Sequence, residues 1–361
     1  MRVYVSKGMK RDKALAICGL SKHQYYYRAK GGKPGRRPSR STLLRAGGGE
    51  RGVPDTEVLS HIRKVLSNPL AGYGYRRMTG QLTLDGYCIN HKKVYRLMKA
   101  ARLLQPKRER GAKGYVKYRV VCPEGPLRLM EMDIKMVWVG GLRRHAYVLT
   151  ILDVFTRAVL HWRAGFQMRQ GQVQGAWEEV IENWLQPAGA LAWDIHIEVR
   201  SDNGPQFCAE KLRKFFKDNY LAQAFTHPYT PQENGHIESF HAILARALEG
   251  QDFEDFPDLC RWLENFYEFY NFDRIHGSTA NLPPMTFAEQ WALGNIERAV
   301  LDEKARKVRF ALKIPRQQVR KARPAGEAAE TGAEPADNGS QREVSSLVLE
   351  GLDAPPIPNS G

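Results

Sequence analysis

The sequence predicts an α/β protein in which a mixed five-stranded sheet domain follows helical units. Three consecutive strand patterns begin at residue 128 and are followed by alternating helix and strand patterns. Before residue 105 the periodic segments have the helical spacing of apolar residues instead. Basic charge is concentrated at the front, because residues 1–110 hold 26 Lys and Arg against 6 Asp and Glu, a net of +20. These observations predict separate binding and sheet domains.

The rest of the +16 net charge is divided unevenly along the chain. Residues 111–301 carry 19 basic against 24 acidic residues, residues 302–323 have a net of +7, and residues 324–361 have a net of −6. A front segment this basic indicates a polyanion-binding arm, since each neutralised phosphate releases counterions. The alternative is a soluble basic domain without such a partner.

Composition excludes several classes of protein. A length of 361 residues predicts two or three domains. No apolar run reaches the roughly 18 to 20 residues of a membrane span, and no signal-peptide apolar region is present. The five cysteines are far apart and form no CxxC pair, which argues against a disulfide framework or a cysteine zinc site. We therefore expect a reducing, intracellular compartment.

The first 30 residues are expected to hold a helix-turn-helix. Ala14, Ile17 and Cys18 form a helical stripe, Gly19 interrupts it, and Ser21 is suited to cap a second helix. Residues 31–54 are rich in Gly, Pro, Ser and Arg, which predicts a flexible basic linker.

A second helix-turn-helix unit is predicted over residues 55–104. Its last helix begins after Asn90, a good N-cap, and turns its apolar residues inward, so that its basic residues face outward like those of a recognition helix. The predicted DNA contacts are Arg76, Arg77, Lys92, Lys93, Arg96 and Lys99. The alternative is a three-helix bundle with a solvated charged face. Residues 105–122 are expected to be a linker.

Residues 123–295 are predicted to form the sheet domain. Strands are expected within 128–139, 145–157, 158–166, 195–204 and 222–229, and helices within 171–185, 209–219, 234–248 and 256–270. A basic extension follows over 296–323. Residues 324–361 are low in complexity and are expected to be disordered.

Three carboxylates occupy positions where chemistry could use them. Asp133 interrupts an apolar strand, where an ionised carboxylate is costly unless paired or bound to a cation. Asp202 follows a strand at its carboxyl end, where open α/β sheets form their ligand crevice. Glu238 lies about 100° around the helix from the apolar Ile237, at the edge of the core. We expect the three to converge.

An all-carboxylate set without a His or Cys cluster suits Mg²⁺ or Mn²⁺. Two such ions can activate an attacking oxygen and stabilise a leaving oxygen at a phosphodiester. The turn residues Asn203 and Gly204 are expected to let a metal or phosphate approach closely, and Asn234 and Gly235 form the corresponding turn before the helix.

Several motifs together resemble a known family. Asp202 and Glu238 are separated by 35 residues, as in the Asp-Asp-35-Glu pattern of retroviral-type integrases and related transposases. "SDNGPQF", "TPQENGHIESF" and "YNFDRIHGSTANLPPMTFAE" resemble segments of the catalytic region of insertion-sequence transposases of family three, OrfB type. "YGYRRM" and "INHKKVYRLMKAARLL" resemble the helix-turn-helix unit that precedes it. The resemblance covers residues 10 to 295.

This resemblance implies an RNase H-like core with Asp133, Asp202 and Glu238 as catalytic residues and ligands of two Mg²⁺ or Mn²⁺ ions. It implies cleavage of DNA at the ends of an insertion sequence and transfer of the freed 3′-hydroxyl. Implied partners are DNA, further copies of the chain in a synapse, and an upstream-frame protein. No membrane partner is expected, and the implied location is the bacterial cytoplasm, at the nucleoid.

The chain departs from the family pattern beside the first acid. Met130 stands where the family usually has Trp, and Lys135 stands where it usually has Thr. Strand alternation puts Glu131 and Lys135 on the face of Asp133, so that Lys135 would contact DNA phosphate or weaken metal binding.

Other titratable residues compete with this assignment. We expect Asp153 to be a local turn cap or ion pair, and His236 and His241 to pack or to support the acids. His276 is undecided. Two alternative functions are a non-catalytic DNA-binding protein derived from a transposase and an RNase H-type nuclease that only hydrolyses.

Overall fold

The computed structural model describes residues 2–27, 39–46, 49–106, 123–191, 195–226, 231–302, 307–319 and 321–323. The linker predicted at 105–122 and the tail predicted at 324–361 lie almost wholly outside these residues. The chain divides into two compact units, Met1–Arg40 and Ser41–Gly361. None of the helices in the described ranges combines the length and the apolarity that crossing a bilayer requires.

The first unit is a set of short helices. They are α1 (Arg2–Ser6), α2 (Arg11–Ile17) and α3 (Lys22–Tyr26). Ser21 caps α3, accepting from Gln24 N while the Gln24 side chain accepts from Ser21 N, as the sequence predicts for Ser21. The predicted apolar stripe is partly wrong, because Ala14 and Leu15 are buried whereas Ile17 is 68% exposed.

The second unit begins with a hairpin rather than with the end of a linker. Strands β1 (Ser41–Ala46) and β2 (Gly49–Pro54) pair antiparallel, and β3 (Tyr87–Cys88) extends them into a sheet of order β2-β1-β3. Leu44 and Val53 are buried in this sheet, which offsets the entropy of ordering the segment. The predicted flexible linker of residues 31–54 is therefore wrong for residues 41–46 and 49–54.

Three helices complete this part, as expected for a helix-turn-helix unit. They are α4 (Asp55–Ser67), α5 (Tyr75–Leu84) and α6 (His91–Ala100). Asn90 caps α6 by accepting from Lys93 N at 2.9 Å. The helices and the hairpin share one apolar cluster, which includes Val58, Ile62 and Met78.

The sheet domain is built on one mixed sheet of order β6-β5-β4-β7-β8. Strands β4, β5 and β6 form an antiparallel meander, and β7 and β8 continue the sheet parallel to β4. The strands are β4 (Leu129–Val139), β5 (Arg144–Asp153), β6 (Val159–Gly165), β7 (Ile197–Ser201) and β8 (Leu221–Phe225). This order and these directions are those of an RNase H-like sheet, as predicted.

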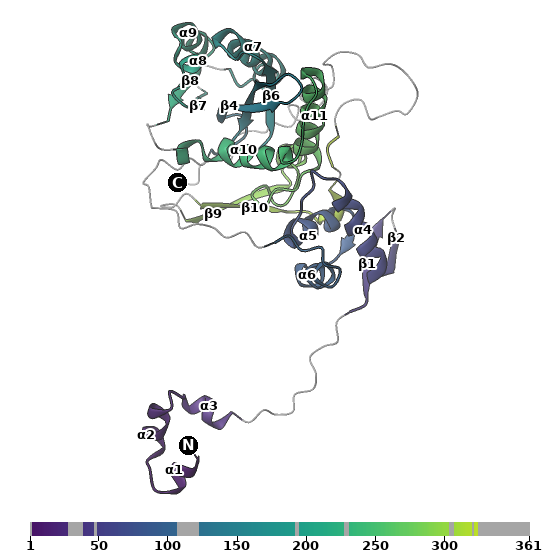
Figure 1. The fold of residues 1–361 in the computed structure, drawn as a ribbon, viewed down its shortest axis with the longest axis vertical. Helices are drawn as coiled ribbons and strands as arrows, with labels where there is room; N and C mark the ends of the chain where they lie inside the picture. Colours follow the sequence, from purple (N-terminus) through teal and green to yellow (C-terminus); the bar gives the residue numbers. More distant parts are fainter. Residues whose placement is uncertain are drawn as a thin grey trace. The chain divides into compact units, whose positions relative to one another are not determined.

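Helices cover both faces of this sheet (Figure 1). On one face Trp177 and Phe216 pack with Met132 and Val199, and on the other Phe240 and Tyr267 pack with Val148. The helices of the first face are α7 (Gln170–Val180), η1 (Ile181–Leu185), α8 (Pro205–Cys208) and α9 (Glu210–Asp218). Those of the second are η2 (Pro231–Asn234), α10 (Gly235–Leu248), α11 (Phe256–Glu268) and η3 (Phe269–Asp273). The aromatic stripe of α11 is core, as expected.

The predicted basic extension is folded where it is described. Helix α12 (Pro284–Ala292) is followed by the hairpin of β9 (Ile296–Asp302) and β10 (Lys307–Leu312), and then by the turn η4 (Arg316–Gln318). Phe310 of β10 packs edge-on against Phe287 at 5.1 Å between ring centroids.

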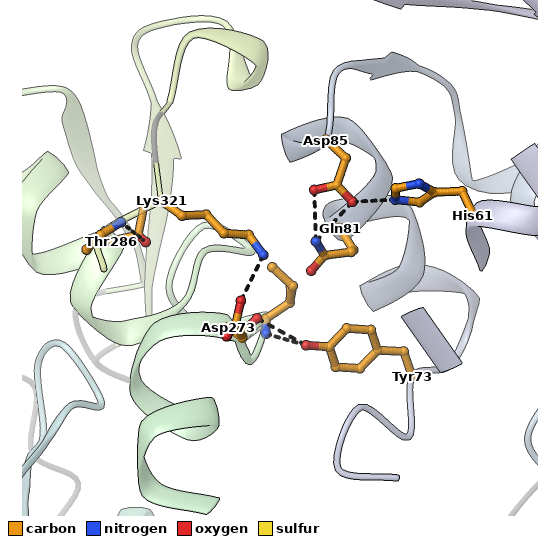
Figure 2. A network of polar contacts seen from close by, with 9 residues as sticks. His61, Tyr73, Gln81, Asp85, Asp273, Thr286 and Lys321 are labelled. Carbon is orange, nitrogen blue, oxygen red and sulfur yellow. Dashed lines mark hydrogen bonds and ion pairs between the residues drawn. The ribbon is translucent and has the colours of Figure 1, made fainter. Parts of the chain in front are cut away.

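The helix-turn-helix unit is packed directly on the sheet domain (Figure 2). The buried Tyr73 hydroxyl donates to Asp273 O at 3.2 Å and accepts from Ile275 N at 3.0 Å. Ile275 belongs to the apolar cluster of the helix-turn-helix unit. Lys321 adds an ion pair to Asp273 at 3.2 Å. The two predicted domains therefore share a core.

Candidate active site

Strand β4 turns Asp133 toward α10. Its neighbours Met130 and Met132 are fully buried on the α7 side, so strand alternation directs Asp133 to the opposite face. The Asp133 side chain is 29% exposed, and its Oδ2 lies 3.2 Å from Nδ1 of His241 on α10. A half-open carboxylate on this face remains available to a ligand.

Asp202 follows β7 on the same side of the sheet. In the parallel ladder Glu131 of β4 pairs with Arg200 of β7, so Asp133 and Asp202 each come two residues after paired positions. Burial raises the pKa of Asp202, and the negative charge of Asp133 raises it further. Two carboxylates that repel each other in this way favour a cation between them.

Glu238 lies in the first turn of α10 and is exposed. It precedes His241 by three positions, so the two side chains are neighbours on the helix surface. Since His241 contacts Asp133, this side of α10 borders the two strand acids. Glu238 therefore lies on the side of α10 that borders Asp133.

The donor set fits a hard divalent cation in kind, since all three candidates offer carboxylate oxygens. The repulsion between Asp133 and Asp202 also fits a cation. Over the described ranges, however, no three His, Cys, Asp or Glu side chains are gathered tightly enough to hold a metal ion. Binding by all three acids would thus require Glu238 to turn toward the other two.

The turn after β7 is shaped around Asp202. The Asp202 carboxylate accepts from Gly204 N at 3.0 Å, and a Cβ on Gly204 would lie 3.1 Å from Asp202 Oδ1 and 2.4 Å from Gln206 Nε2. Asn203 donates to Thr226 O at 2.9 Å, which ties this turn to the residue after β8. Glycine at 204 thus leaves room for the carboxylate.

The turn before α10 contains the other two supporting residues. Asn234 is 6% exposed, and its Oδ1 has no hydrogen-bond partner within the described residues. Gly235 begins the helix, and nothing lies within 4 Å of the position of its Cβ. Neighbouring atoms therefore leave no room for a side chain at position 204, whereas position 235 has room for one.

The sequence analysis missed that Glu131 and Arg200 attach the start of α10 to the sheet. Glu131 Oε2 accepts from His236 N at 3.0 Å and from Ile237 N at 2.7 Å, at the start of α10. Arg200 donates to Glu233 O at 3.1 Å. Burial raises the pKa of Glu131 to about 7, against the lowering effect of the Ile237 hydrogen bond. The available signal was a charged residue two positions before each strand acid.

Asp153, His236 and His276 are each surrounded by neighbouring residues of the protein core. Asp153 is fully buried and accepts from Thr156 N at 2.8 Å and Leu127 N at 3.1 Å, which confirms a turn cap. Burial, with the charges of Arg157 and Arg200, lowers the pKa of His236 to about 3. His276 is buried against Tyr270, with ring centroids 4.9 Å apart.

The departures beside Asp133 differ in their surroundings. Met130 is fully buried in the core on the α7 side and faces away from the acids. Lys135 is half-buried and shares the face of Asp133 by alternation. Only Lys135 is thus placed to influence the acids.

The six predicted DNA contacts fall into two groups. Lys93 and Arg96 form ion pairs with Asp55, at 2.7 and 3.1 Å. Arg77 is half-buried, and its charge acts on Arg274 and Tyr270 of the sheet domain. The residues that point outward are Arg76, Lys92 and Lys99, which are all exposed.

An aromatic group accompanies these exposed cations. Tyr95 is 41% exposed between Lys92 and Lys99 on the outer face of α6, and its ring lies 5.2 Å from that of Tyr75. Arg76 lies over the Tyr75 ring at 5.9 Å. Lys92, Tyr95 and Lys99 follow one another at helical spacing, so they form one outward stripe.

Comparison with known proteins gives the same division of the chain. The family model described as "HTH-like domain" matches residues 55–111. Two models described as "Integrase core domain" match residues 123–231 and 220–284.

Individual relatives are proteins of insertion elements. The chain is 29% identical over 263 residues to transposase InsD of element IS2 from Escherichia coli, covering 68% of this chain and 83% of the relative. It is 27% identical over 251 residues to a protein of element IS476 from Xanthomonas euvesicatoria, covering 69% of each.

Solved structures with a similar core have lower identity. A chain of the simian T-cell lymphotropic virus intasome, solved with a PP2A regulatory subunit, is 14% identical with a TM-score of 0.38, covering 60% of this chain and 70% of that one. The Mos1 transposase catalytic domain bound to Raltegravir and Mg is 15% identical with a TM-score of 0.35, covering 39% of this chain and 71% of that one. In its matched domains and relatives, the chain is similar to insertion-sequence transposases, with an HTH-like domain followed by an integrase core domain.

Proposed function

We propose that this transposase cuts and joins DNA at the ends of an insertion sequence, with Asp133, Asp202 and Glu238 as its catalytic acids. The observation that carries the proposal is the proximity of Asp133 and Asp202, which is close enough for one charge to raise the pKa of the other. Helix α10, which bears Glu238, starts on the buried Glu131 of the same strand as Asp133. The three acids thus border one region.

The reaction needs no covalent link between protein and DNA. Water attacks a phosphodiester at the element end, a P–O bond breaks, and the released strand carries a 3′-hydroxyl. That hydroxyl then attacks a phosphodiester of the target, a new P–O bond forms, and the target strand leaves with its own 3′-hydroxyl. Asp133, Asp202 and Glu238 would hold two Mg²⁺ or Mn²⁺ ions, which supply charge stabilisation and nucleophile activation when bound.

The remaining parts of the proposal concern partners. Joining two ends requires at least two protomers, so we infer a dimer on paired terminal DNA. An upstream-frame protein is a further proposed partner, and the proposed place of action is the nucleoid in the bacterial cytoplasm. Sizing of the complex on paired ends tests the dimer, and a complex with one protomer would contradict it.

A cleavage assay on labelled terminal DNA tests the chemistry. We expect nicking and strand-transfer products with Mg²⁺, and loss of both in Asp133→Asn, Asp202→Asn and Glu238→Gln, which remove carboxylate charge with little change of size. Unchanged DNA binding by the variants would exclude unfolding as the cause.

The same assay separates the two alternative functions. Equal inactivity of the wild type and the variants would support a DNA-binding protein without catalysis, which Lys135 beside Asp133 would favour. Equal activity of all of them would contradict the assignment of the three acids. Cleavage without joined products would support a nuclease that only hydrolyses.

A further inference from the structure

We propose that Glu131 and Arg200 are positioning residues that set where Glu238 stands relative to the two strand acids. The inference rests on the proposed function for the chemistry and on hydrogen bonds of the described residues for the geometry. Each residue lies two positions before a candidate metal ligand, Glu131 before Asp133 and Arg200 before Asp202.

Glu131 holds the first turn of α10. Glu131 is 1% exposed, and its Oε2 accepts hydrogen bonds from both His236 N and Ile237 N. The first amides of a helix lack partners within the helix, and a carboxylate there is favoured by the helix dipole. The buried acid thus binds the residue that directly precedes Glu238.

Arg200 holds the turn that leads into the same helix. It is 5% exposed, and its Nη1 donates to Glu233 O in η2. Its Nε donates to Glu198 Oε1 at 2.5 Å, which orients the guanidinium along β7. The chain on both sides of the η2–α10 junction is thereby attached to strand side chains.

The two residues also lie beside each other. Glu131 and Arg200 are register partners of the parallel β4–β7 ladder, and the Arg200 charge acts on the Glu131 carboxyl. Glu131 of β4 and Arg200 of β7 therefore link the two strands that carry Asp133 and Asp202 to the segment that begins α10, which carries Glu238. Moving either partner would shift Glu238 relative to both acids.

The competing explanation is that the pair only stabilises the fold. Replacing both members of a buried charged pair by well-packed apolar residues can be neutral or stabilising, whereas removing one member leaves the other charge uncompensated. Stability and positioning can therefore be separated by experiment. Outer residues that orient metal ligands typically change metal affinity by about 10- to 100-fold when replaced.

The test uses the full chain with Glu131→Met, Glu131→Gln and Arg200→Met. Glutamine keeps an oxygen that can accept the two amides, whereas methionine keeps the volume and removes the acceptor. Asp153→Asn is the matched control, because Asp153 is an equally buried carboxylate that caps the β5–β6 turn instead of α10.

Two quantities are measured: amide hydrogen exchange over residues 235–248 and the Mg²⁺ concentration for half-maximal DNA cleavage. We expect Glu131→Met and Arg200→Met to speed exchange at the start of α10 and to raise the Mg²⁺ requirement about 10- to 100-fold. We expect Glu131→Gln to restore both toward wild type, and Asp153→Asn to change neither.

The outcomes distinguish this inference from the proposed function. Unchanged exchange and unchanged Mg²⁺ requirement in Glu131→Met, in a protein whose Asp202→Asn variant is inactive, would overturn the inference and leave the function standing. Equal effects of Glu131→Gln and Glu131→Met would also overturn it. If no protein cleaves DNA, the function fails, and the exchange data still decide whether the pair holds α10.

Discussion

Glu131 and Asp133 show how two acids on one face of one strand acquire different tasks. Both project from β4 toward α10, because successive side chains of a strand alternate between faces. Glu131 is covered by the start of α10, and its carboxylate is used by the backbone amides of the helix. Asp133 lies further along, has a side chain that is 29% exposed, and contacts Ile134 N and the His241 ring. Coverage by the helix, and not residue type, thus separates the structural acid Glu131 from Asp133, which we propose to be catalytic.

At the residue scale, the room beside Asp202 should matter for activity. In Gly204→Ala the new Cβ would lie 2.4 Å from Gln206 Nε2 and 3.1 Å from Asp202 Oδ1, so the Gln206 side chain has to move and the Asp202 carboxylate has to give way slightly. Because misplacement of a reacting group by about 1 Å can cost on the order of 100-fold, we expect this smaller displacement of Asp202 to lower Mg²⁺-dependent cleavage by roughly 10-fold.

The matched control is Gly171→Ala on α7, where nothing lies within 4 Å of the added Cβ. Cleavage rates and thermal midpoints of both variants would be compared with the wild type. A Gly204→Ala protein as active as Gly171→Ala would contradict a close fit around Asp202.

At the element scale, some basic residues of α6 bind Asp55 within the protein, and others are exposed and are predicted to contact DNA. Lys93 and Arg96 bind Asp55 of α4, and Lys93 also donates to Ser41 O at 2.7 Å. Lys92, Tyr95 and Lys99 occupy the adjoining, exposed side of the helix. This outer stripe is therefore presented to a DNA backbone or groove, whereas the Lys93 side chain, 12% exposed, is held by Asp55.

Replacing members of the two groups should give different results. Lys92→Ala and Lys99→Ala are each expected to weaken DNA binding and to lower the salt slope by about 1, because each removes one phosphate contact. Lys93→Ala should instead lower the free energy of unfolding, since it leaves the half-buried Asp55 with one partner fewer. Binding titrations at several salt concentrations and urea unfolding would check this. A salt slope that changes only with Lys93→Ala would reverse the assignment.

The contact between the helix-turn-helix unit and η3 depends on one hydroxyl. Tyr73→Phe removes the group that bonds Asp273 O and Ile275 N, and leaves the buried Ile275 amide without that acceptor. We expect the free energy of unfolding to fall by about 1 to 3 kcal/mol. Urea unfolding measures the change, with the exposed Tyr95→Phe as a control that should be neutral. A neutral Tyr73→Phe would show that apolar packing alone holds the two parts together.

At the scale of the whole molecule, charge and packing divide the chain at different points. The basic front extends to residue 110, but the compact second unit begins at Ser41 and includes the helix-turn-helix elements. Residues 1–40 hold 12 Lys and Arg against one Asp and form a unit of their own. The first unit thus adds charge without sharing the core of the second.

Removal of residues 1–40 should therefore separate binding from stability. We expect the thermal midpoint of the remaining chain to stay unchanged, because its apolar clusters are intact. Non-specific DNA affinity and its salt slope should both fall, since 12 cations are lost. Scanning calorimetry and binding titrations measure the two effects. A lower midpoint would contradict the independence of the first unit.

Local patterns were sufficient for much of this fold. The strands of the sheet, the helices between them and the Asn90 and Ser21 caps follow from periodicity and from capping chemistry, which act within a few residues. The hairpin of residues 41–54 did not follow, because Gly- and Arg-rich segments read as linkers and its strands are stabilised by Tyr87, far along the chain. The outward direction assigned to Lys93 failed for a similar reason, since its side chain is 12% exposed and its partner Asp55 lies in another helix.

The sequence by itself determined the type of protein, because the composition, the succession of strand and helix patterns and the spacing of Asp133, Asp202 and Glu238 can all be read along the chain. The tertiary structure decided which charges face solvent and which hold the fold. Glu131 and Arg200 become neighbours only when β4 and β7 pair, and they meet α10 only when that helix packs on the sheet. The free energies of burial and of pairing across long separations depend on the folded chain, so they cannot be predicted from a local pattern of residues.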